Sequence, residues 1–322
     1  MLLTGGVMDT VVNIKNLVKR YKELIAVDHF DLEIKKGEVF GLLGPNGSGK
    51  TTTINCLLSL LDYDKGEIEL FGKPMSPVAY DLKRRIGVVP QNVAVYEELT
   101  VYENIDYFCG LYITDKAERK KCVDDAIKFV GLEEFRKFMP KKLSGGLLRR
   151  LNIACGIAHK PELIIMDEPT VAVDPQSRNR ILEGITELNE KGATIIYTSH
   201  YMEEVEQICS RIVIMDKGRG IAMGSNDELK KMIKNTERII VEMNEPAAEV
   251  LAAMRNLPHV IEVKYGDGRL TVGCAGGKHN LIRVLEVLQK EELSFGRVYT
   301  EMPTLNDVFL EITGKQLRDS EQ

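Results

Sequence analysis

The sequence has no apolar run long enough to cross a lipid bilayer. Apolar runs such as residues 163–166 and 193–197 are far shorter than the ~20 residues that a membrane-spanning helix needs. The first ten residues, MLLTGGVMDT, lack the basic start and the sustained apolar core of a secretory leader, and they are compatible with a start at either Met1 or Met8. We therefore expect a chain that does not cross a membrane by itself.

Paired cysteines and an excess of positive charge are also lacking. The six cysteines form no C-x-x-C pair and no His/Cys spacing that suits zinc, which favours reduced, buried thiols in a cytosolic protein. The formal net charge of -5 argues against nucleic acid as a main partner. With 44% hydrophobic and 28% charged residues over 322 positions, the chain has enough apolar content for one large domain and a smaller one.

Residues 11–224 alternate short β-branched runs with helical patterns, which predicts an α/β domain built on a largely parallel sheet. Between about residues 100 and 160 the strand signal disappears and apolar residues recur at helical spacing, so we predict a helical insertion at about 95–160. The expected buried strands, all nearly continuous in apolar residues, are 39–43, 86–90, 163–167, 193–199 and 211–216.

A second domain is predicted after the first. We place the first domain at 1–226, a charged, helix-prone connector at 227–237, and a small domain at 238–322 that ends in a polar tail. The expected order in the small domain is a strand at 238–243, a helix at 246–256, strands at 260–265 and 269–274, a helix at 278–290 and a strand at 294–301, followed by a last helix at 304–312. This βαββαβ order is that of a ferredoxin-like α+β fold.

A glycine-rich segment directly follows the first expected buried strand. It reads Gly44-Pro45-Asn46-Gly47-Ser48-Gly49-Lys50-Thr51-Thr52 and fits the P-loop pattern GxxxxGKT between a strand and a helix. In such a loop, backbone N–H groups and the helix N-terminus surround phosphate oxygens. Lys50 would neutralise phosphate charge and the Thr51 hydroxyl would ligate Mg²⁺.

Two acidic residues end the apolar strand at 163–167. Asp167 fits the role of a Mg²⁺ ligand, directly or through water, and Glu168 can polarise an attacking water. Adjacent acids after a strand are often only a solvated strand end. The P-loop upstream makes a catalytic function the better interpretation.

A second anion-binding helix start lies at Leu143-Ser144-Gly145-Gly146, just before this acidic strand. With it, residues 11–224 resemble the ATP-binding cassette (ABC) ATPases, whose signature is LSGGQ. The resemblance implies a P-loop NTPase cassette that hydrolyses ATP with Mg²⁺. It also implies adenine stacking on Tyr21, a Q-loop glutamine and further Mg²⁺ ligand at Gln91, a D-loop aspartate at Asp174, and a switch histidine at His200 that contacts the γ-phosphate.

Two positions depart from the family pattern. Leu147 stands where the signature usually has glutamine, and Val171-Ala172-Val173 stands where a Ser-Gly-Leu pattern is common. Leu147 cannot form the side-chain hydrogen bonds of glutamine, and Ala172 and Val173 would stiffen the D-loop. Neither change removes an expected phosphate or metal ligand.

The resemblance further implies a head-to-tail homodimer, in which ATP lies between Lys50 of one chain and Ser144 of the other. The partner would be a separate transmembrane permease, with the chain cytoplasmic and peripheral on the cytoplasmic face of the membrane. The segment 303–314, PTLNDVFLEITG, resembles the end of the accessory domain of ABC-2 exporters, which favours export. The apolar segment 92–102 is either a groove for the membrane subunit or ordinary packing of the insertion.

Three other functions compete with this interpretation. A soluble, non-transport ABC ATPase is the main alternative, although the chain has neither the two cassettes nor the long coiled coils of such proteins. In a P-loop kinase, neither the signature at Ser144 nor His200 would have a role. A non-hydrolysing regulator would be expected to lack the base, which Glu168 supplies.

Overall fold

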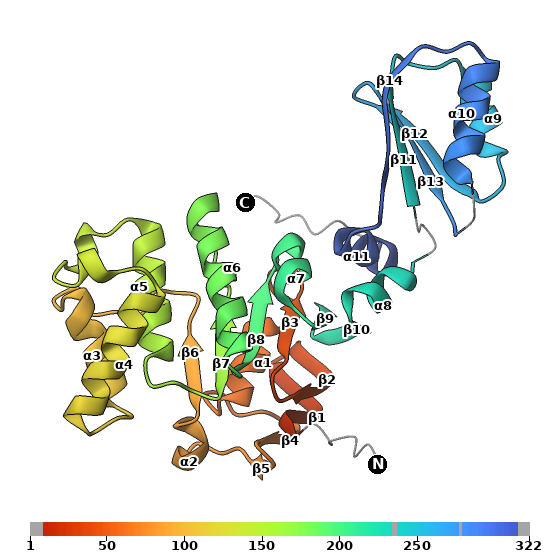
Figure 1. Cartoon of the computed structure of the whole chain (residues 1–322). Helices are drawn as coiled ribbons and strands as arrows, with labels where there is room; N and C mark the ends of the chain where they lie inside the picture. The colour runs from red at the N-terminus through yellow and green to blue at the C-terminus, as the bar shows by residue number, and fades with distance from the viewer. Residues whose placement is uncertain (1–8, 234–236, 277–278, 315–322) are drawn as a thin grey trace, which may run out of the picture. The chain divides into compact units, whose positions relative to one another are not determined.

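The computed structural model describes residues 9–233, 237–276 and 279–314, and these divide into two units between Ser225 and Asn226. The first unit contains a six-stranded sheet with the order β10-β9-β3-β8-β7-β6 (Figure 1). All neighbouring pairs are parallel except the edge pair β10 and β9. The strands are β3 (Val39–Leu43), β6 (Ile86–Val89), β7 (Leu163–Asp167), β8 (Thr194–Ser199), β9 (Arg211–Asp216) and β10 (Arg219–Gly224). The five parallel strands lie within a residue of their predicted bounds.

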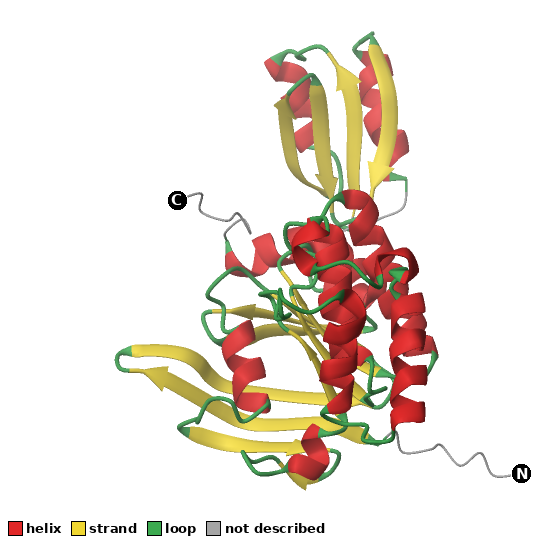
Figure 2. Ribbon diagram, turned by 90° about the vertical axis from the view of Figure 1, so that its left-hand side faces the viewer, coloured by secondary structure: helices red, strands yellow, loops and turns green. Residues whose placement is uncertain are grey.

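The expectation of one largely parallel sheet omitted a second sheet in the same unit. This sheet is antiparallel, has the order β2-β1-β4-β5, and forms a separate layer (Figure 2). Its strands are β1 (Thr10–Tyr21), β2 (Leu24–Lys35), β4 (Lys65–Leu70) and β5 (Lys73–Pro74). One buried core contains side chains of both sheets and of α1 (Lys50–Leu57), including Ile14, Phe40 and Ile54. Local residue patterns indicate that a segment is a strand, but they do not say which sheet it joins.

The predicted helical insertion is confirmed by three helices that contact one another: α3 (Val101–Gly110), α4 (Lys116–Phe129) and α5 (Gly145–Ile157) (Figure 1). Their N-caps are Thr100, Asp115 and Ser144, each of which accepts a backbone N–H in the first turn. The unit's remaining helical segments are α2 (Tyr80–Lys83), η1 (Glu133–Phe135), η2 (Pro140–Lys142), α6 (Pro175–Glu190) and α7 (Met202–Ile208). Within the described ranges, no helix has both the length and the hydropathy needed to span a membrane.

The second unit has the predicted ferredoxin-like order. Its antiparallel sheet runs β12-β13-β11-β14, and its core joins strand residues to α9 and α10. In the expected connector the chain forms α8, which contacts α11 within this same unit. The elements are α8 (Asn226–Lys231), β11 (Glu237–Met243), α9 (Ala248–Arg255), β12 (Val260–Gly266), β13 (Arg269–Cys274), α10 (Asn280–Lys290), β14 (Phe295–Glu301) and α11 (Leu305–Thr313). The expected polar tail at 316–322 lies outside the described residues.

Two glycines let α5 lie directly against β6. A Cβ on Gly87 would stand 2.3 Å from the carbonyl oxygen of Gly156 and 2.6 Å from Cγ of Pro161. A Cβ on Gly156 would stand 2.7 Å from the carbonyl oxygen of Val88. Because Gln91 follows β6 and Ser144 begins α5, this contact fixes the spacing between two segments that the sequence predicts to be functional.

We therefore expect Gly87→Ala to destabilise the first unit by about 1–3 kcal/mol, as overpacking does in tightly packed interiors. The midpoint of thermal unfolding should fall by several degrees, on the order of 2–4 °C per kcal/mol for a domain of this size. Gly110→Ala is the matched control, because its added Cβ would come no closer than 3.4 Å to the flexible Arg119 side chain. Equal midpoints for the two variants would contradict the close approach.

Candidate functional site

The loop between β3 and α1 has the geometry of a phosphate cradle. Gly47 and Gly49 have φ angles of 78° and 105°, in the region that favours glycine. A Cβ on Gly44 would lie 2.4 Å from the carbonyl oxygen of Met215, and one on Gly49 would lie 2.5 Å from that of Ala26. Larger residues would therefore displace the loop at both positions.

Two further features fit this cradle to an anion. α1 starts after Gly49 with no side-chain cap, so the N–H groups of its first turn are available to a bound ligand. The hydroxyl oxygen of Ser48 is buried and has no hydrogen-bond partner among the described residues. A phosphate oxygen would satisfy these donors.

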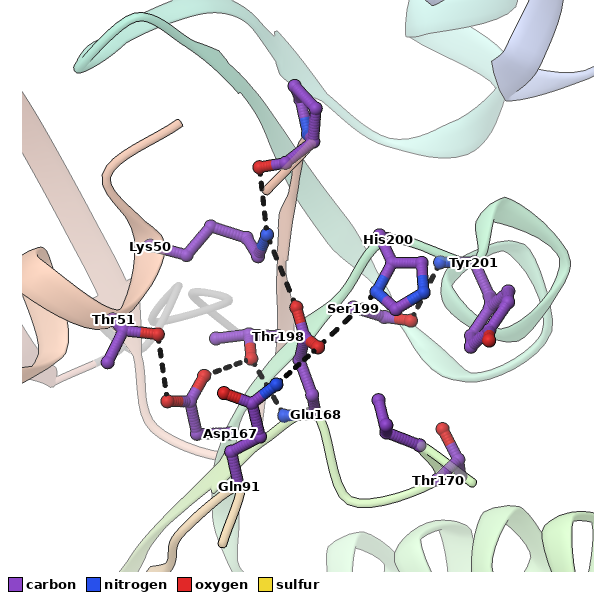
Figure 3. Close-up of polar contacts among 12 residues, drawn as sticks. Lys50, Thr51, Gln91, Asp167, Glu168, Thr170, Thr198, Ser199, His200 and Tyr201 are labelled. Atoms are coloured by element: carbon purple, nitrogen blue, oxygen red, sulfur yellow. Dashed lines mark hydrogen bonds and ion pairs between the residues drawn. The ribbon is translucent and has the colours of Figure 1, made fainter. Parts of the chain in front are cut away.

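Lys50 lies at the centre of the site and is only 5% exposed. Its Nζ donates to the carbonyl oxygens of Gly44 and Pro45 at 2.8 and 3.2 Å, and lies 3.4 Å from Oε1 of Glu168 (Figure 3). In this arrangement the ammonium group is held by the loop and by the carboxylate. A phosphate group entering the loop would offer the same ammonium group a stronger anionic partner.

Asp167 and Thr51 supply the oxygen atoms expected at a Mg²⁺ site. The Thr51 hydroxyl donates to Oδ2 of Asp167 at 3.0 Å, and the Thr198 hydroxyl donates to Oδ1 at 2.6 Å. No group of three or more His, Cys, Asp or Glu side chains in the described residues could hold a metal by itself. Mg²⁺ is usually bound by one or two carboxylates together with substrate phosphates and water, so the oxygen donors of Thr51 and Asp167 fit this ion.

The Glu168 carboxylate contacts side chains from three other segments of the chain. Besides Lys50, its carboxylate accepts a hydrogen bond from Nε2 of Gln91 at 3.1 Å and lies 3.3 Å from Nδ1 of His200 (Figure 3). Burial by itself would raise the pKa of Glu168, but hydrogen bonding to His200 and the positive charge of Lys50 outweigh burial, and the pKa lies below its ordinary value. The side chain is therefore an ionised carboxylate at neutral pH, as a general base requires.

The backbone of Glu168 is held in an unusual conformation. Its φ of 47° lies in the left-handed region, which costs an L-residue about 1–2 kcal/mol. The Thr198 hydroxyl accepts the Glu168 N–H at 2.9 Å in the buried interior and stabilises this turn. Lys50, Thr51, Gln91, Asp167, Glu168 and His200 thus lie together, and we call them the phosphate cluster.

Ser144, Gly145, Gly146 and Asp174 form a second group, which we call the outer cluster. Ser144, Gly145 and Asp174 are exposed, and Ser144 and Asp174 are the N-caps of α5 and α6. A Cβ on Gly146 would stand 2.3 Å from the Ser177 hydroxyl and 3.2 Å from the Asp174 carboxylate. The two helix starts therefore lie directly against each other at a point where only glycine fits.

Arg149 was not assigned a role from the sequence, yet it joins α5, the helix that begins at Ser144, to the backbone of Gln91. The residue is buried, and its Nη1 donates to the carbonyl oxygen of Gln91 at 2.6 Å, while its Nη2 lies 3.5 Å from that of Val171. Burial lowers the pKa of the guanidinium group. The available signal was an arginine at a core-facing position of an apolar helix, which is unusual unless the charge is well hydrogen-bonded.

The remaining expected positions lie near these clusters. Tyr21 is 44% exposed at the end of β1, on the hairpin whose second strand passes Gly49 at Ala26. Ala172 has a φ of 58°, so the predicted stiffening of the D-loop coincides with a backbone conformation that glycine adopts more readily. Leu147 is half-buried and its N–H donates to the Ser144 hydroxyl at 3.3 Å.

Two protein families match this chain. Residues 27–171 match the family described as ABC transporter, and residues 224–313 match the C-terminal domain described as ATP-binding protein DrrA1-3-like. The chain is 39% identical over 307 residues to the linearmycin resistance ATP-binding protein LnrL of Bacillus subtilis, covering 95% of this chain and 99% of the relative. It is 34% identical to the daunorubicin resistance ATP-binding protein DrrA3 of Streptomyces coeruleorubidus, covering 97% and 99% of the two chains.

Solved structures agree with this assignment. The ATP-binding subunit of an ABC transporter matches with a TM-score of 0.64 and 28% identity, covering 69% of this chain and 93% of the other. A dimeric post-hydrolysis state of the cassette MJ0796, bound to ADP and phosphate, matches with a TM-score of 0.61 and 28% identity over 66% and 98% of the two chains. This chain thus belongs to the ABC transporter family, as an ATP-binding and ATP-hydrolysing subunit with a DrrA1-3-like C-terminal domain.

Proposed function

We propose that this chain powers export by a separate transmembrane permease, through an ATP-driven head-to-tail homodimer on the cytoplasmic face of the membrane. The observation that carries the dimer is the exposed outer cluster, in which one helix N-terminus presents Ser144 and Gly145 to solvent. A helix start of this kind is an anion site, and in the dimer it would bind the phosphates held by Lys50 of the other copy.

Export and the permease are supported by the relatives. LnrL and DrrA3 are named as resistance ATP-binding proteins, and a protein of Ralstonia nicotianae that is 34% identical over 96% of this chain is named Nod factor export ATP-binding protein I. These names favour a transport subunit over a soluble, non-transport ATPase. Within this reading we propose the cassette at residues 1–226, a connector at 227–237 and the accessory domain at 238–322.

In the proposed mechanism each residue of the phosphate cluster has a distinct task. When ATP enters the loop, its phosphates bind the Lys50 ammonium group. This weakens the contact between Lys50 and Glu168 seen in Figure 3. Glu168 then accepts a proton from the attacking water, and Gln91 and His200 hold that carboxylate in place while His200 contacts the γ-phosphate. Thr51, Asp167 and Gln91 would hold Mg²⁺, which neutralises charge on the phosphates.

The adenine and phosphate contacts divide between the two copies. Within one chain, Tyr21 would stack on adenine, and the loop from Gly44 to Thr52 would bind the phosphates. From the other chain, Ser144, Gly145 and Gly146 would bind the γ-phosphate, and Asp174 would cross the interface. Hydrolysis removes the γ-phosphate that joins the halves, and the dimer opens.

The role of Glu168 is tested by Glu168→Gln, which keeps the shape of the side chain and removes its charge. Steady-state hydrolysis should fall by about 10²-fold or more, the range that a general base supplies, while ATP still binds. ATP should then hold the chain as a stable dimer in size-exclusion chromatography. The control is Glu183→Gln at an exposed position of α6. Turnover of Glu168→Gln close to that of the control would exclude Glu168 as the base.

The shared site is tested by mixing two inactive variants, Ser144→Arg and Lys50→Ala. Ser144→Arg should abolish hydrolysis but leave nucleotide binding to the monomer intact, since that binding depends on Lys50 and Tyr21. Half of the dimers in an equimolar mixture are mixed, and each has one intact composite site, so activity should recover to at most about a quarter of the wild-type value. If mixed dimers form and no activity returns, the head-to-tail arrangement is wrong.

The second unit is proposed to assist dimerisation, because it has its own core and every residue of both clusters precedes it. A chain ending at Ser225 should bind ATP as the full-length chain does. Its specific activity should fall at low protein concentration and recover at high concentration, because a loss of a few kcal/mol shifts the dimer constant about a hundredfold. Superimposable activity curves for the two chains would assign the unit a different role.

A further inference from the structure

Glu204, in α7, is a buried acidic residue that the mechanism above does not use. It is 3% exposed, and its Oε2 accepts three hydrogen bonds, from the hydroxyl groups of Thr170 at 2.9 Å, Tyr197 at 2.8 Å and Ser199 at 2.9 Å. Its Oε1 lies 3.2 Å from Nε of Arg178. A buried carboxylate is costly unless it is fully paired, so these four groups are held around it.

One side of this network holds the segment that carries His200. The Ser199 hydroxyl donates to Glu204 and accepts the backbone N–H of Tyr201 at 2.9 Å. Ser199 and Tyr201 flank His200 in the sequence, and Figure 3 shows them on either side of its imidazole. Glu204 therefore holds Ser199 directly and, through the Ser199 hydroxyl, the Tyr201 end of the three-residue turn that presents His200 to Glu168.

The other side of the network leads to the outer cluster. Thr170 lies two residues after Glu168, and Arg178 lies one turn after Asp174 in α6. The Arg178 guanidinium also lies over the Tyr201 ring, 4.8 Å from its centroid, and that ring lies 4.1 Å from the His200 ring. A continuous set of contacts thus joins the start of α6 to His200, with Glu204 at its centre.

We propose that Glu204 is a positioning residue that couples the Asp174 end of α6 to the orientation of His200. The proposal depends on the proposed function, in which Asp174 meets the second copy and His200 meets the γ-phosphate. A shift of α6 on dimerisation would move Arg178, and because Glu204 links Arg178 to Ser199, the turn carrying His200 would follow. Glu204 itself does not touch the nucleotide.

A purely structural role for Glu204 predicts a different effect of its replacement on hydrolysis. If the carboxylate only stabilised the core, its replacement would lower the unfolding temperature and reduce hydrolysis by the same factor whether or not His200 were present. If Glu204 acts through His200, the two replacements must be strongly non-additive. The kinetic comparison therefore separates positioning from simple stabilisation.

The first experiment compares Glu204→Gln with Glu203→Gln in the full-length chain. Glu203 is exposed on the same helix, so its replacement removes the same charge without touching the network. Misplacing a reacting group can cost about 10²-fold, so we expect kcat of Glu204→Gln to fall by about 10- to 100-fold. KM for ATP should change by less than about threefold, because the P-loop is unaltered. Equal kcat values for the two variants would overturn the proposal.

The second experiment repeats the replacement in a His200→Ala background, using single-turnover hydrolysis at saturating ATP. There, Glu204→Gln should cost less than about threefold, because the residue that it positions is already absent. An equal fold-loss in both backgrounds would overturn the positioning role. A milder variant, Ser199→Ala, breaks only the link to the turn and should show the same dependence on His200; it replaces Glu204→Gln if that variant does not fold.

The same data separate this proposal from the proposed function. If His200→Ala lowers kcat while Glu204→Gln does not, His200 keeps its role and the coupling through Glu204 is wrong. If His200→Ala hydrolyses ATP at the wild-type rate, the assignment of His200 in the proposed function is wrong, and positioning through it is excluded as well. Loss of activity in Glu168→Gln shows that the measured hydrolysis comes from the site that contains Glu168.

Discussion

The rest of the site depends on one buried carboxylate, that of Glu168. An ionised carboxylate in the interior requires cationic or hydrogen-bonding partners, and here they are Lys50, Gln91 and His200. Each partner follows a different strand of the same sheet, at its carboxyl end, as Glu168 itself does. The order β3-β8-β7-β6 makes these strand ends neighbours, so the parallel topology is what brings the four residues together.

Sequence patterns predicted the parallel strands and the phosphate loop because both depend on local features, whereas Gln91 and His200 were expected only from the resemblance to the family. A continuous apolar run identifies a buried strand, and the strand, the glycines and Lys50 identify a phosphate loop within a dozen residues. Glu204 and Arg149 gave no comparable signal. In the segment 202–207, MEEVEQ, Glu204 looks like one of three acids on the solvent side of a helix, and its burial follows from Thr170 and Arg178, which are distant in the sequence.

The departures from the family pattern are best understood through packing. Gly146 stands where a Cβ would meet the Ser177 hydroxyl at 2.3 Å, so the start of α5 lies directly against the start of α6. Leu147, the next residue, is half-buried, and it contacts the Ser144 hydroxyl through its backbone N–H, which a change of side chain does not remove. At Ala172 the departure has an energetic cost in the backbone, because the residue has a φ of 58°, which glycine would adopt without strain.

At Gly146 the starts of α5 and α6 lie in direct contact, and two separate sets of contacts lead from these helices to Glu168. Arg149 connects α5 to the backbone of Gln91, and Gln91 donates to Glu168. Glu204 connects α6 to the turn of His200, which contacts the same carboxylate. The two sets of contacts reach Glu168 through different partners, Gln91 and His200, so in the proposed dimer a displacement of α5 and α6 would reach both contacts of this carboxylate. In the proposed homodimer, the orientation of the Glu168 carboxylate would therefore depend on the position of the outer cluster.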